Sequence, residues 1–526
     1  MDSGCGNIAI DSAVATYSLH FSTMTRMEYQ KMRDQSADVV IVGSGPTGSA
    51  YARIIRRDWP QAKIIIVEAG PYTREDVGSH LDNIADLDAR RAAEIQAQGP
   101  TRHSYDPITE AEWMERRAGR FDASLQRRHG LFLANEDDAK GENMFAGFSA
   151  ANVGGMATKW STGCPVPSSA ELVSFIDPAE MTAALDLSSQ LLGVNRDLRP
   201  DDTTAQTLRA KLGEQFNPDR TADRYVQPMP LACTPTREGL KWHGIDVILG
   251  DMLSEPAETF KILAETACRK VLHENGVVTG VELAVPGTDD TWQVRAGTVI
   301  VAGDSLHSPQ LLWASGIRPD ALGRHLNDHY QITQLCEMQS EKPMLTMSWI
   351  PGVEGWPFSV TIAPTSAHTL PFPATFDGFP VFVGVFAASD VIAENRVTFD
   401  DSKTDWLGLP AISITAHKTA QDLDRLEQGK ALALRIANVV GRPAPGFATT
   451  VLPVGSSLHY QGTIRMGETD DGASVCDKTS KVWGFENLYV AGNGVIPTMT
   501  ATNPTLYSVA LATIGARQVA AARRTA

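Results

Sequence analysis

Residues 38–70 contain the feature that most restricts how this chain can fold. The β-branched run Asp38-Val39-Val40-Ile41-Val42 leads into a turn, Gly43-Ser44-Gly45-Pro46-Thr47-Gly48, and a second apolar run, Ile64-Ile65-Ile66-Val67, ends at Glu68. About four helical turns fit between the two runs, so the order is strand, glycine turn, helix and strand. We interpret this segment as one βαβ unit, which requires a parallel sheet and predicts an α/β fold.

Each residue of the turn has a physical task in binding a dinucleotide. Gly43 permits the tight turn, Gly45 lets backbone amides reach a pyrophosphate at the helix N-terminus, and Gly48 lets helix and strand pack closely. Glu68 stands 20 residues after Gly48, where a carboxylate can bind both hydroxyls of an adenosine ribose. The segment predicts a dinucleotide site, against the alternative of an ordinary tight turn, and it does not separate NAD from FAD.

Length, charge and cysteine content limit the class of protein. A chain of 526 residues exceeds the size of a single core, so two or more folding units are expected. The net charge of −16 and the pI near 5.2 argue against nucleic acid or an anionic membrane as partner. Six scattered cysteines, no secretory signal and no run of ~20 apolar residues favour a reduced, cytoplasmic protein without disulfides or membrane spans.

Changes in composition suggest how the chain divides into domains. We expect an N-terminal arm over 1–36 and a helical insertion over 74–140, where charged residues are frequent. The nucleotide domain is predicted to be discontinuous, and its parts are 37–73, 141–165, 231–330 and 455–526. A second domain, 166–230 with 331–454, is expected to hold the substrate on an antiparallel sheet, with a Pro- and Gly-rich loop at 345–379 as a possible lid.

Two local predictions concern positions near the expected site. Cys268 is predicted to lie in a helix or turn between strands. An apolar helix is expected from about 505 to 522, with Pro504 at its first position and Asn503 as its cap.

Several blocks of the sequence resemble the glucose-methanol-choline (GMC) flavoprotein oxidoreductases. Besides the glycine turn with Glu68, they span nearly the whole chain in the order of that family: Ala302-Gly303-Asp304 through Ser308-Pro309-Gln310 to Ile317, Gly323-Arg324-His325-Leu326-Asn327-Asp328-His329, His459 to Gly467, and Asn503-Pro504-Thr505. The resemblance implies a Rossmann-like FAD-binding domain joined to a discontinuous α+β substrate-binding domain. It also implies these FAD-binding residues: Gly43, Gly45, Thr47, Gly48, Glu68, Gly154, Met156, Thr158, Trp160, Ser161, Cys268, Ala302, Asn493, Asn503, Pro504 and Thr505.

Within that family the chain is most similar to the pyranose oxidase branch. The similarity lies in Val153-Gly154-Gly155-Met156-Ala157-Thr158-Lys159-Trp160 and in the segment around Arg465. Fungal pyranose oxidases have a histidine bonded covalently to the flavin where this chain has Lys159. The resemblance therefore implies FAD held without a covalent bond, and oxidation of a secondary hydroxyl, at C2 or C3 of a sugar or glycoside, with electrons passing to O2 or a quinone.

His459 and Asn503 are the candidate catalytic residues. Histidine is the side chain best suited to accept an alcohol proton near neutral pH. The two residues lie on segments flanking the last buried strand, Leu488-Tyr489-Val490, so both can reach one edge of the sheet. By resemblance, His459 takes the hydroxyl proton and Asn503 donates a hydrogen bond to the substrate oxygen. The substrate hydride passes to flavin N5.

Other interpretations remain open at this point. Ser161 can lie beside flavin N5, or can be a loop hydroxyl bonded to its own backbone. His325 and His329, four residues apart, resemble a metal site but suggest no third ligand, so no metal is expected. The chain has no GxSxG segment for serine hydrolysis. Alternatives for the whole protein are a quinone-dependent sugar dehydrogenase, a lyase of the same fold with non-redox FAD, and a non-enzymatic binding protein; subunit number is not predicted.

Overall fold

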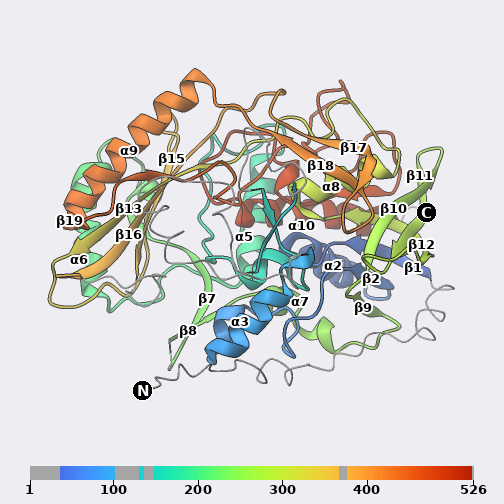
Figure 1. Cartoon of the computed structure of the whole chain (residues 1–526), viewed down its shortest axis with the longest axis horizontal. Coiled ribbons are helices and arrows are strands. Elements are labelled where there is room, and N and C mark those ends of the chain that lie inside the picture. The colour runs from blue at the N-terminus through green and yellow to red at the C-terminus, as the bar shows by residue number, and fades with distance from the viewer. Residues whose placement is uncertain (1–35, 101–129, 136–146, 238, 366–375, 524–526) are drawn as a thin grey trace, which may run out of the picture.

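The computed structural model describes residues 36–100, 130–135, 147–237, 239–365 and 376–523. Two large sheets dominate the molecule and lie side by side in Figure 1, each with its own helices and hydrophobic core. The predicted α/β architecture with a second, antiparallel unit is confirmed. The expected N-terminal arm lies outside the described residues except for its last position.

The first sheet begins with the predicted βαβ unit. β1 (Ser36–Val42) pairs in parallel with β2 (Ile64–Val67) and with β12 (Thr291–Val301). The sheet continues through β9 (Phe260–Leu263) on one side and β21 (Leu488–Val490) beside β12. Segments distant in the sequence thus complete one parallel sheet, because these short runs are apolar enough to be buried on both faces.

Two antiparallel strands extend this sheet beyond β12. They are β10 (Ala267–Glu274) and β11 (Val277–Ala284). Cys268 therefore lies in a strand, and the prediction of a helix or turn there was wrong. Alternating buried and exposed residues along β12 and β11 stabilise strands at a position where the local sequence alone left the choice open.

Helices α2 (Pro46–Asp58), α5 (Pro178–Leu192) and α10 (Thr505–Ala522) belong to the first core, where α2 packs on β1 and β2 and α10 packs on α2 and α5. α10 is apolar on nearly every side and is buried from Leu506 to Ala516, as expected of a helix inside a core. Its cap is Pro504 rather than Asn503, and it starts at Thr505. The prediction for this helix end was wrong by one position, which leaves the Asn503 side chain without a capping role.

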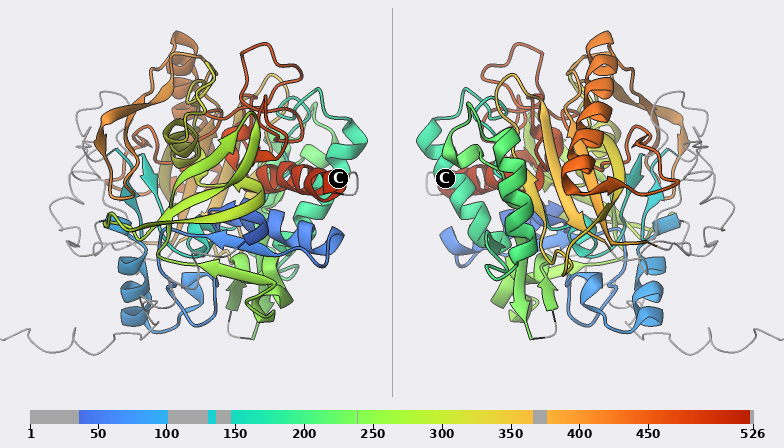
Figure 2. Two further views of the ribbon diagram at one scale, coloured as in Figure 1. Left: turned by 90° about the vertical axis from the view of Figure 1, so that its right-hand side faces the viewer. Right: turned by 90° about the vertical axis from the view of Figure 1, so that its left-hand side faces the viewer.

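The second sheet is antiparallel. Its order is β19 (Arg442–Pro443), β13 (Tyr330–Met338), β16 (Phe379–Ala387), β15 (Phe358–Pro364), β14 (Ser348–Ile350) and β6 (Gln227–Pro228), with β20 (Thr450–Val451) also on β13. α9 (Ala420–Val440) lies across its strands and α6 (Thr203–Phe216) beside α9, as the right-hand view of Figure 2 shows. Gly429 allows this close packing, since a Cβ there would lie 2.7 Å from Ile332 Cδ1.

Three of the predicted segments differ in detail. Within 345–379, residues Ser348–Ile350 and Phe358–Pro364 are strands rather than loop, and 366–375 lie outside the described residues. Within 166–230, α5 packs in the first core and α6 in the second. The described part of 74–140 contains the helix α3 (Leu87–Gln96).

The remaining elements are short or lie at the junction of the two sheets. α8 (Asp304–Ala314) follows β12 and packs against a ribbon of β17 (Arg396–Thr404) and β18 (Pro410–Thr415). The others are β3 (Phe132–Leu133), β4 (Phe148–Ser149), β5 (Val194–Asn195), β7 (Leu231–Thr236), β8 (Gly239–Trp242), α7 (Ile245–Leu249), and the 3₁₀ turns η1 (Leu81–Asn83), η5 (Gly155–Thr158), η6 (Ala222–Arg224), η7 (Gly250–Ser254) and η9 (Asn493–Val495).

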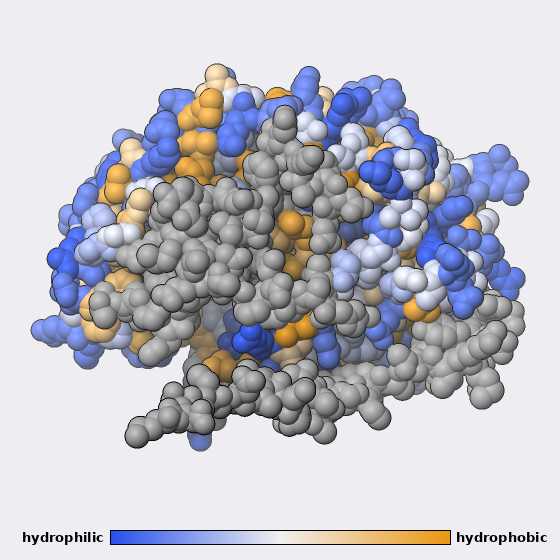
Figure 3. Space-filling view, viewed as in Figure 1, coloured by the Kyte–Doolittle hydropathy of each residue, from blue (hydrophilic) through white to orange (hydrophobic). Residues whose placement is uncertain are grey.

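Across the described ranges, no helix combines the length and apolar character needed to cross a bilayer. Hydrophilic side chains cover much of the coloured surface in Figure 3. The five cysteines in the described part of the chain are buried and unpaired.

Candidate active site

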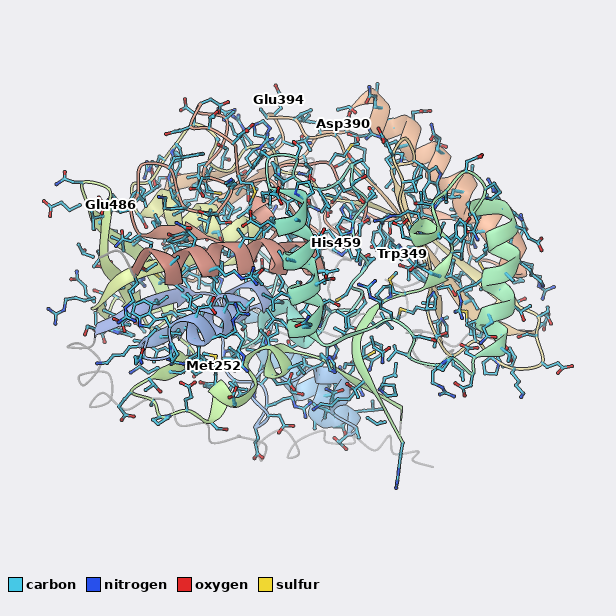
Figure 4. The ribbon with its side chains drawn as sticks, turned by 180° about the vertical axis from the view of Figure 1, so that it is seen from behind. Met252, Trp349, Asp390, Glu394, His459 and Glu486 are labelled. Carbon is cyan, nitrogen blue, oxygen red and sulfur yellow. The ribbon has the colours of Figure 1, made fainter. Side chains whose placement is uncertain are left out.

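A cavity of roughly 520 Å³ lies between the carboxyl ends of β1 and β12 and the second sheet. Its walls come from both halves of the molecule, with Glu68 on one side and Gln331 and Phe386 on the other. His459 lies near the middle of the molecule in Figure 4 and lines this cavity. The volume is typical of a small-molecule or cofactor site, and open α/β sheets bind ligands at this edge.

Most of the predicted site residues line the cavity, although they come from eight separate parts of the chain. Those that line it are Gly43, Gly45, Thr47, Glu68, Met156, Trp160, Ser161, Cys268, Ala302, His459, Asn493, Asn503 and Thr505. Gly48, Gly154, Thr158 and Pro504 do not line it. These four shape the backbone behind the wall: Gly154 N–H, for example, donates to Ser44 Oγ at 2.9 Å.

The glycine turn has the geometry expected of a phosphate-binding turn. Gly43 has φ +106°, and a Cβ there would lie 2.2 Å from the Ala302 carbonyl oxygen. A Cβ on Gly48 would lie 2.1 Å from the Gly43 oxygen, whereas a Cβ on Gly45 would meet no atom within 4 Å. Gly43 and Gly48 are thus required by packing, and Gly45 opens the N-terminus of α2, which has no side-chain cap, toward the cavity.

Glu68 is held rigidly at the end of β2. Its Oε2 accepts hydrogen bonds from Ser44 N–H at 3.1 Å and Ser44 Oγ at 2.6 Å, and Oε1 accepts from Gly70 N–H at 3.1 Å. Burial raises the pKa of Glu68, although these hydrogen bonds oppose the shift. A carboxylate offers about four acceptor positions, so lone-pair capacity remains for ligand hydroxyls. Ser44, which the sequence did not single out, links Glu68 to Gly154.

Lys159 is a buried amine on the same wall. Its Nζ donates to Asn152 Oδ1 at 2.6 Å. Burial lowers the pKa of Lys159 to about 7, against the opposing effect of the Glu68 and Glu94 carboxylates. The neighbouring Trp160 donates from Nε1 to the His243 carbonyl at 2.9 Å, which fixes this segment against the first core.

The His459 imidazole is partly buried, and one of its two nitrogens has a partner. Its Nδ1 lies 2.9 Å from Nδ1 of His329, and no hydrogen bond to Nε2 is made by any described residue. Burial lowers the pKa of His459 to about 3. The imidazole is therefore neutral at physiological pH, which is the form that can accept a proton.

Asp328 fixes the backbone that presents this imidazole. Its carboxylate accepts hydrogen bonds from Gly455 N–H at 3.0 Å, from His459 N–H at 3.2 Å and from the Ser457 hydroxyl. Burial raises the pKa of Asp328 to about 6. The described residues hold no group of three or more His, Cys, Asp or Glu side chains that could bind a metal ion.

Asn503 has an unsatisfied polar atom at the cavity wall. The residue is 8% exposed, and its buried Oδ1 has no hydrogen-bond partner among the described residues. A Cβ built at Gly163 would lie 3.6 Å from Asn503 Nδ2 and 3.9 Å from Ser161 Oγ, so these two side chains approach the same glycine. Buried polar atoms are rarely left unpaired, and this one fits a site that binds a polar ligand.

A polar cluster on the cavity wall was missed by the sequence analysis. Asp304 comes three residues after the end of β12 and has φ +74°. Its carboxylate accepts from Ser149 Oγ at 2.8 Å and lies 3.2 Å from His307 Nδ1. Burial lowers the pKa of His307, but the Asp304 carboxylate outweighs it, so that this pKa is raised. The position of Asp304 at the carboxyl end of a parallel strand is a signal that could have identified it.

Comparisons with known proteins agree with this geometry. Two profiles described as GMC oxidoreductase match residues 158–331 and 392–512. The chain is 40% identical over 510 residues to a C-glycoside 3-oxidase of Microbacterium trichothecenolyticum (92% of this chain, 96% of that protein). It is 30% identical over 546 residues to a pyranose 2-oxidase of Tricholoma matsutake (92% and 93%).

Two solved structures share the fold. They are a pyridoxine 4-oxidase from Mesorbium loti (TM-score 0.58, 17% identity, 92% of this chain and 99% of that one) and a formate oxidase from Aspergillus oryzae (TM-score 0.65, 13% identity, 93% and 99%). At these identities the likeness concerns the fold alone.

Proposed function

The chain belongs to the GMC oxidoreductase family, and on that premise we propose that it oxidises a secondary ring hydroxyl of a pyranose sugar or glycoside to the ketone. The observation that carries the proposal is the shared cavity, in which His459 and Asn503 lie with the glycine turn and Glu68. C3 of a glycoside is favoured over C2, because the relatives named glycoside 3-oxidases are about 40% identical and the pyranose 2-oxidase is 30% identical.

The residues present fit FAD, the cofactor that GMC oxidoreductases bind. Open space at Gly45 and the uncapped N-terminus of α2 suit a pyrophosphate, and Glu68 suits ribose hydroxyls. When bound, FAD supplies a hydride acceptor at N5 and passes the electrons to O2, giving H2O2, or to a quinone.

The chain's own residues move the proton and orient the substrate. The neutral His459 accepts the hydroxyl proton at Nε2, and Asn503 donates from Nδ2 to the substrate oxygen. The positive end of α10, which begins at Thr505 on the cavity wall, favours negative charge in the site. Ser161, beside Asn503, is proposed to influence the reactivity toward O2.

Anaerobic reduction of the flavin tests the function. A panel of sugars and glycosides is added under nitrogen, and absorbance near the flavin maximum is followed. Bleaching, together with identification of the keto product by NMR, supports the proposal. A panel that leaves the flavin oxidised favours a lyase with non-redox FAD. Reoxidation by air separates an oxidase from a dehydrogenase that needs benzoquinone.

We expect FAD to be released completely when the protein is precipitated with acid. By resemblance, Lys159 stands where fungal pyranose oxidases carry a flavin-linked histidine. Its amine donates a hydrogen bond to Asn152. The measurement is flavin absorbance in the supernatant and in the redissolved pellet. A yellow pellet after washing would show a covalent bond and contradict this expectation.

The rate of flavin reduction should begin to fall only at an unusually low pH. Because burial lowers the pKa of His459 to about 3, the reduction rate at saturating substrate should stay constant from pH 8 to below pH 6.5, the ordinary histidine value. Stopped-flow reduction at each pH measures it. A rate that falls with a midpoint near 6.5 would contradict the assignment.

Folding stability provides the control for that profile. Below pH 6.5 the unfolded chain binds a proton at His459 that the folded protein excludes, so this residue's contribution to stability declines as pH falls from 6.5 toward 3. Thermal unfolding at each pH defines the range in which the rates refer to folded protein.

A further inference from the structure

Behind His459, a buried chain of side chains leads away from the cavity. His459 Nδ1 lies 2.9 Å from His329 Nδ1, and His329 Nε2 lies 2.9 Å from Thr500 Oγ1. Gln461 Nε2 lies 2.8 Å from Thr500 Oγ1 and 3.2 Å from His329 Nε2, and Gln461 Oε1 lies 3.2 Å from Thr500 Oγ1. His329, Gln461 and Thr500 are each at most 2% exposed, so their polar atoms depend on one another for hydrogen bonds.

The hydrogens shared by these four side chains can be arranged in two ways, which differ in the direction of every hydrogen bond. If the amide nitrogen of Gln461 points at His329 Nε2, it donates, so His329 Nε2 must be the acceptor and carries no hydrogen. His329 Nδ1 then carries the hydrogen that is shared with His459. His459 would carry its own hydrogen on Nε2, facing the cavity, and could only donate. In this direction the imidazole cannot take a proton from a substrate.

The opposite direction leaves a lone pair in the cavity. A half-turn of the Gln461 amide exchanges its oxygen and nitrogen. Its oxygen then accepts from the Thr500 hydroxyl, and Thr500 Oγ1 accepts from His329 Nε2–H. His329 Nδ1 is left bare and accepts from His459 Nδ1–H. His459 Nε2 therefore has no hydrogen and faces the cavity as an acceptor.

We propose that His329, Thr500 and Gln461 are positioning residues that hold His459 in the tautomer able to accept the substrate proton. The inference rests on the proposed function, because it assigns the direction that a base requires. None of the three lines the cavity, so they act through His459 and do not touch the substrate. Neither His329 nor the other two were candidates from the sequence, in which His329 suggested only a metal ligand.

Nitrogen-15 NMR of histidine-labelled holoenzyme, without substrate, reads the tautomers directly. His459→Gln and His329→Gln variants assign the signals. The expected result is His459 protonated at Nδ1 and bare at Nε2, with His329 protonated at Nε2 and bare at Nδ1. A hydrogen on Nε2 of His459 in the unmodified protein would overturn the proposal.

Two matched variants at position 500 test whether the Thr500 hydroxyl affects the rate of flavin reduction. Thr500→Val keeps the shape and removes the hydroxyl, whereas Thr500→Ser keeps the hydroxyl. We expect Thr500→Val to slow flavin reduction about 10- to 100-fold with substrate affinity within about twofold, and to give a mixture of His459 tautomers. Thr500→Ser should restore the rate and the single tautomer. Equal loss in both variants, or a Thr500→Val spectrum like that of the unmodified protein, would overturn the proposal.

The two proposals can fail separately. The NMR spectrum requires no substrate, so it tests the tautomer even if no sugar bleaches the flavin. Conversely, bleaching by a glycoside establishes the oxidation even if His459 proves to carry its hydrogen on Nε2.

Discussion

Replacing His459 by alanine is expected to lower the rate of flavin reduction about 10²–10⁴-fold. Without the imidazole, the histidine left on the described part of the cavity wall is His307, whose Nδ1 lies 3.2 Å from the Asp304 carboxylate. Binding of FAD should be retained, because the glycine turn and Glu68 are left unchanged. Stopped-flow absorbance under nitrogen, at saturating substrate, gives the rate.

His273 provides the control for this variant. It lies on β10, contacts Phe485 and does not line the cavity. His273→Ala should reduce the flavin at the rate of the unmodified protein. If His459→Ala did so as well, His459 would not be the base, and the search for one would turn to the His307 and Asp304 pair.

Gly43→Ala is expected to destabilise the folded protein by about 3 kcal/mol. The new Cβ would lie 2.2 Å from the Ala302 carbonyl oxygen, and the backbone has φ +106°. Left-handed backbone costs an alanine roughly 1–2 kcal/mol, and forcing extra volume into packed backbone costs typically about 1–3 kcal/mol more. Urea unfolding of the FAD-free protein measures the change.

Gly45→Ala separates folding from cofactor binding. A Cβ at this position meets no atom within 4 Å, so the FAD-free variant should unfold at the urea concentration of the unmodified protein. The same methyl group occupies space over the N-terminus of α2, so FAD should bind more weakly. Equal destabilisation of the FAD-free protein by both substitutions would show that the clash at Gly43 relaxes at little cost.

Local patterns predicted the first sheet well. Ile64–Val67 and Asp38–Val42 are short, β-branched and bounded by turns, and such runs have few alternatives once a glycine turn and a helix separate them. The lid segment was predicted less well, since prolines and aromatics around Phe358 conceal the alternation that pairs this strand with β16. The prediction of a helix or turn at Cys268 was wrong for a similar reason, because its strand is stabilised by pairing with Leu283, which is distant in the sequence.

Long-range contacts explain the site residues that the sequence could not identify. Ser44 was not singled out in the turn, but its hydroxyl connects Glu68 with Gly154. His329 is paired with a histidine 130 positions away, and no local spacing predicts that contact. Asn503 was a candidate from the sequence, but its predicted role as helix cap was wrong, and its unpaired Oδ1 is seen only in the structure.

The last helix of the chain has a consequence for biosynthesis. α10 packs against both α2 and α5, and its first residue, Thr505, lines the same cavity as the glycine turn that begins at Gly43. A polypeptide still attached to the ribosome at this helix has an unfilled core beside its first strand. We expect a chain cut shortly before Thr505 to bind no FAD, because it would lack both this part of the cavity wall and the packing of α10 on α2.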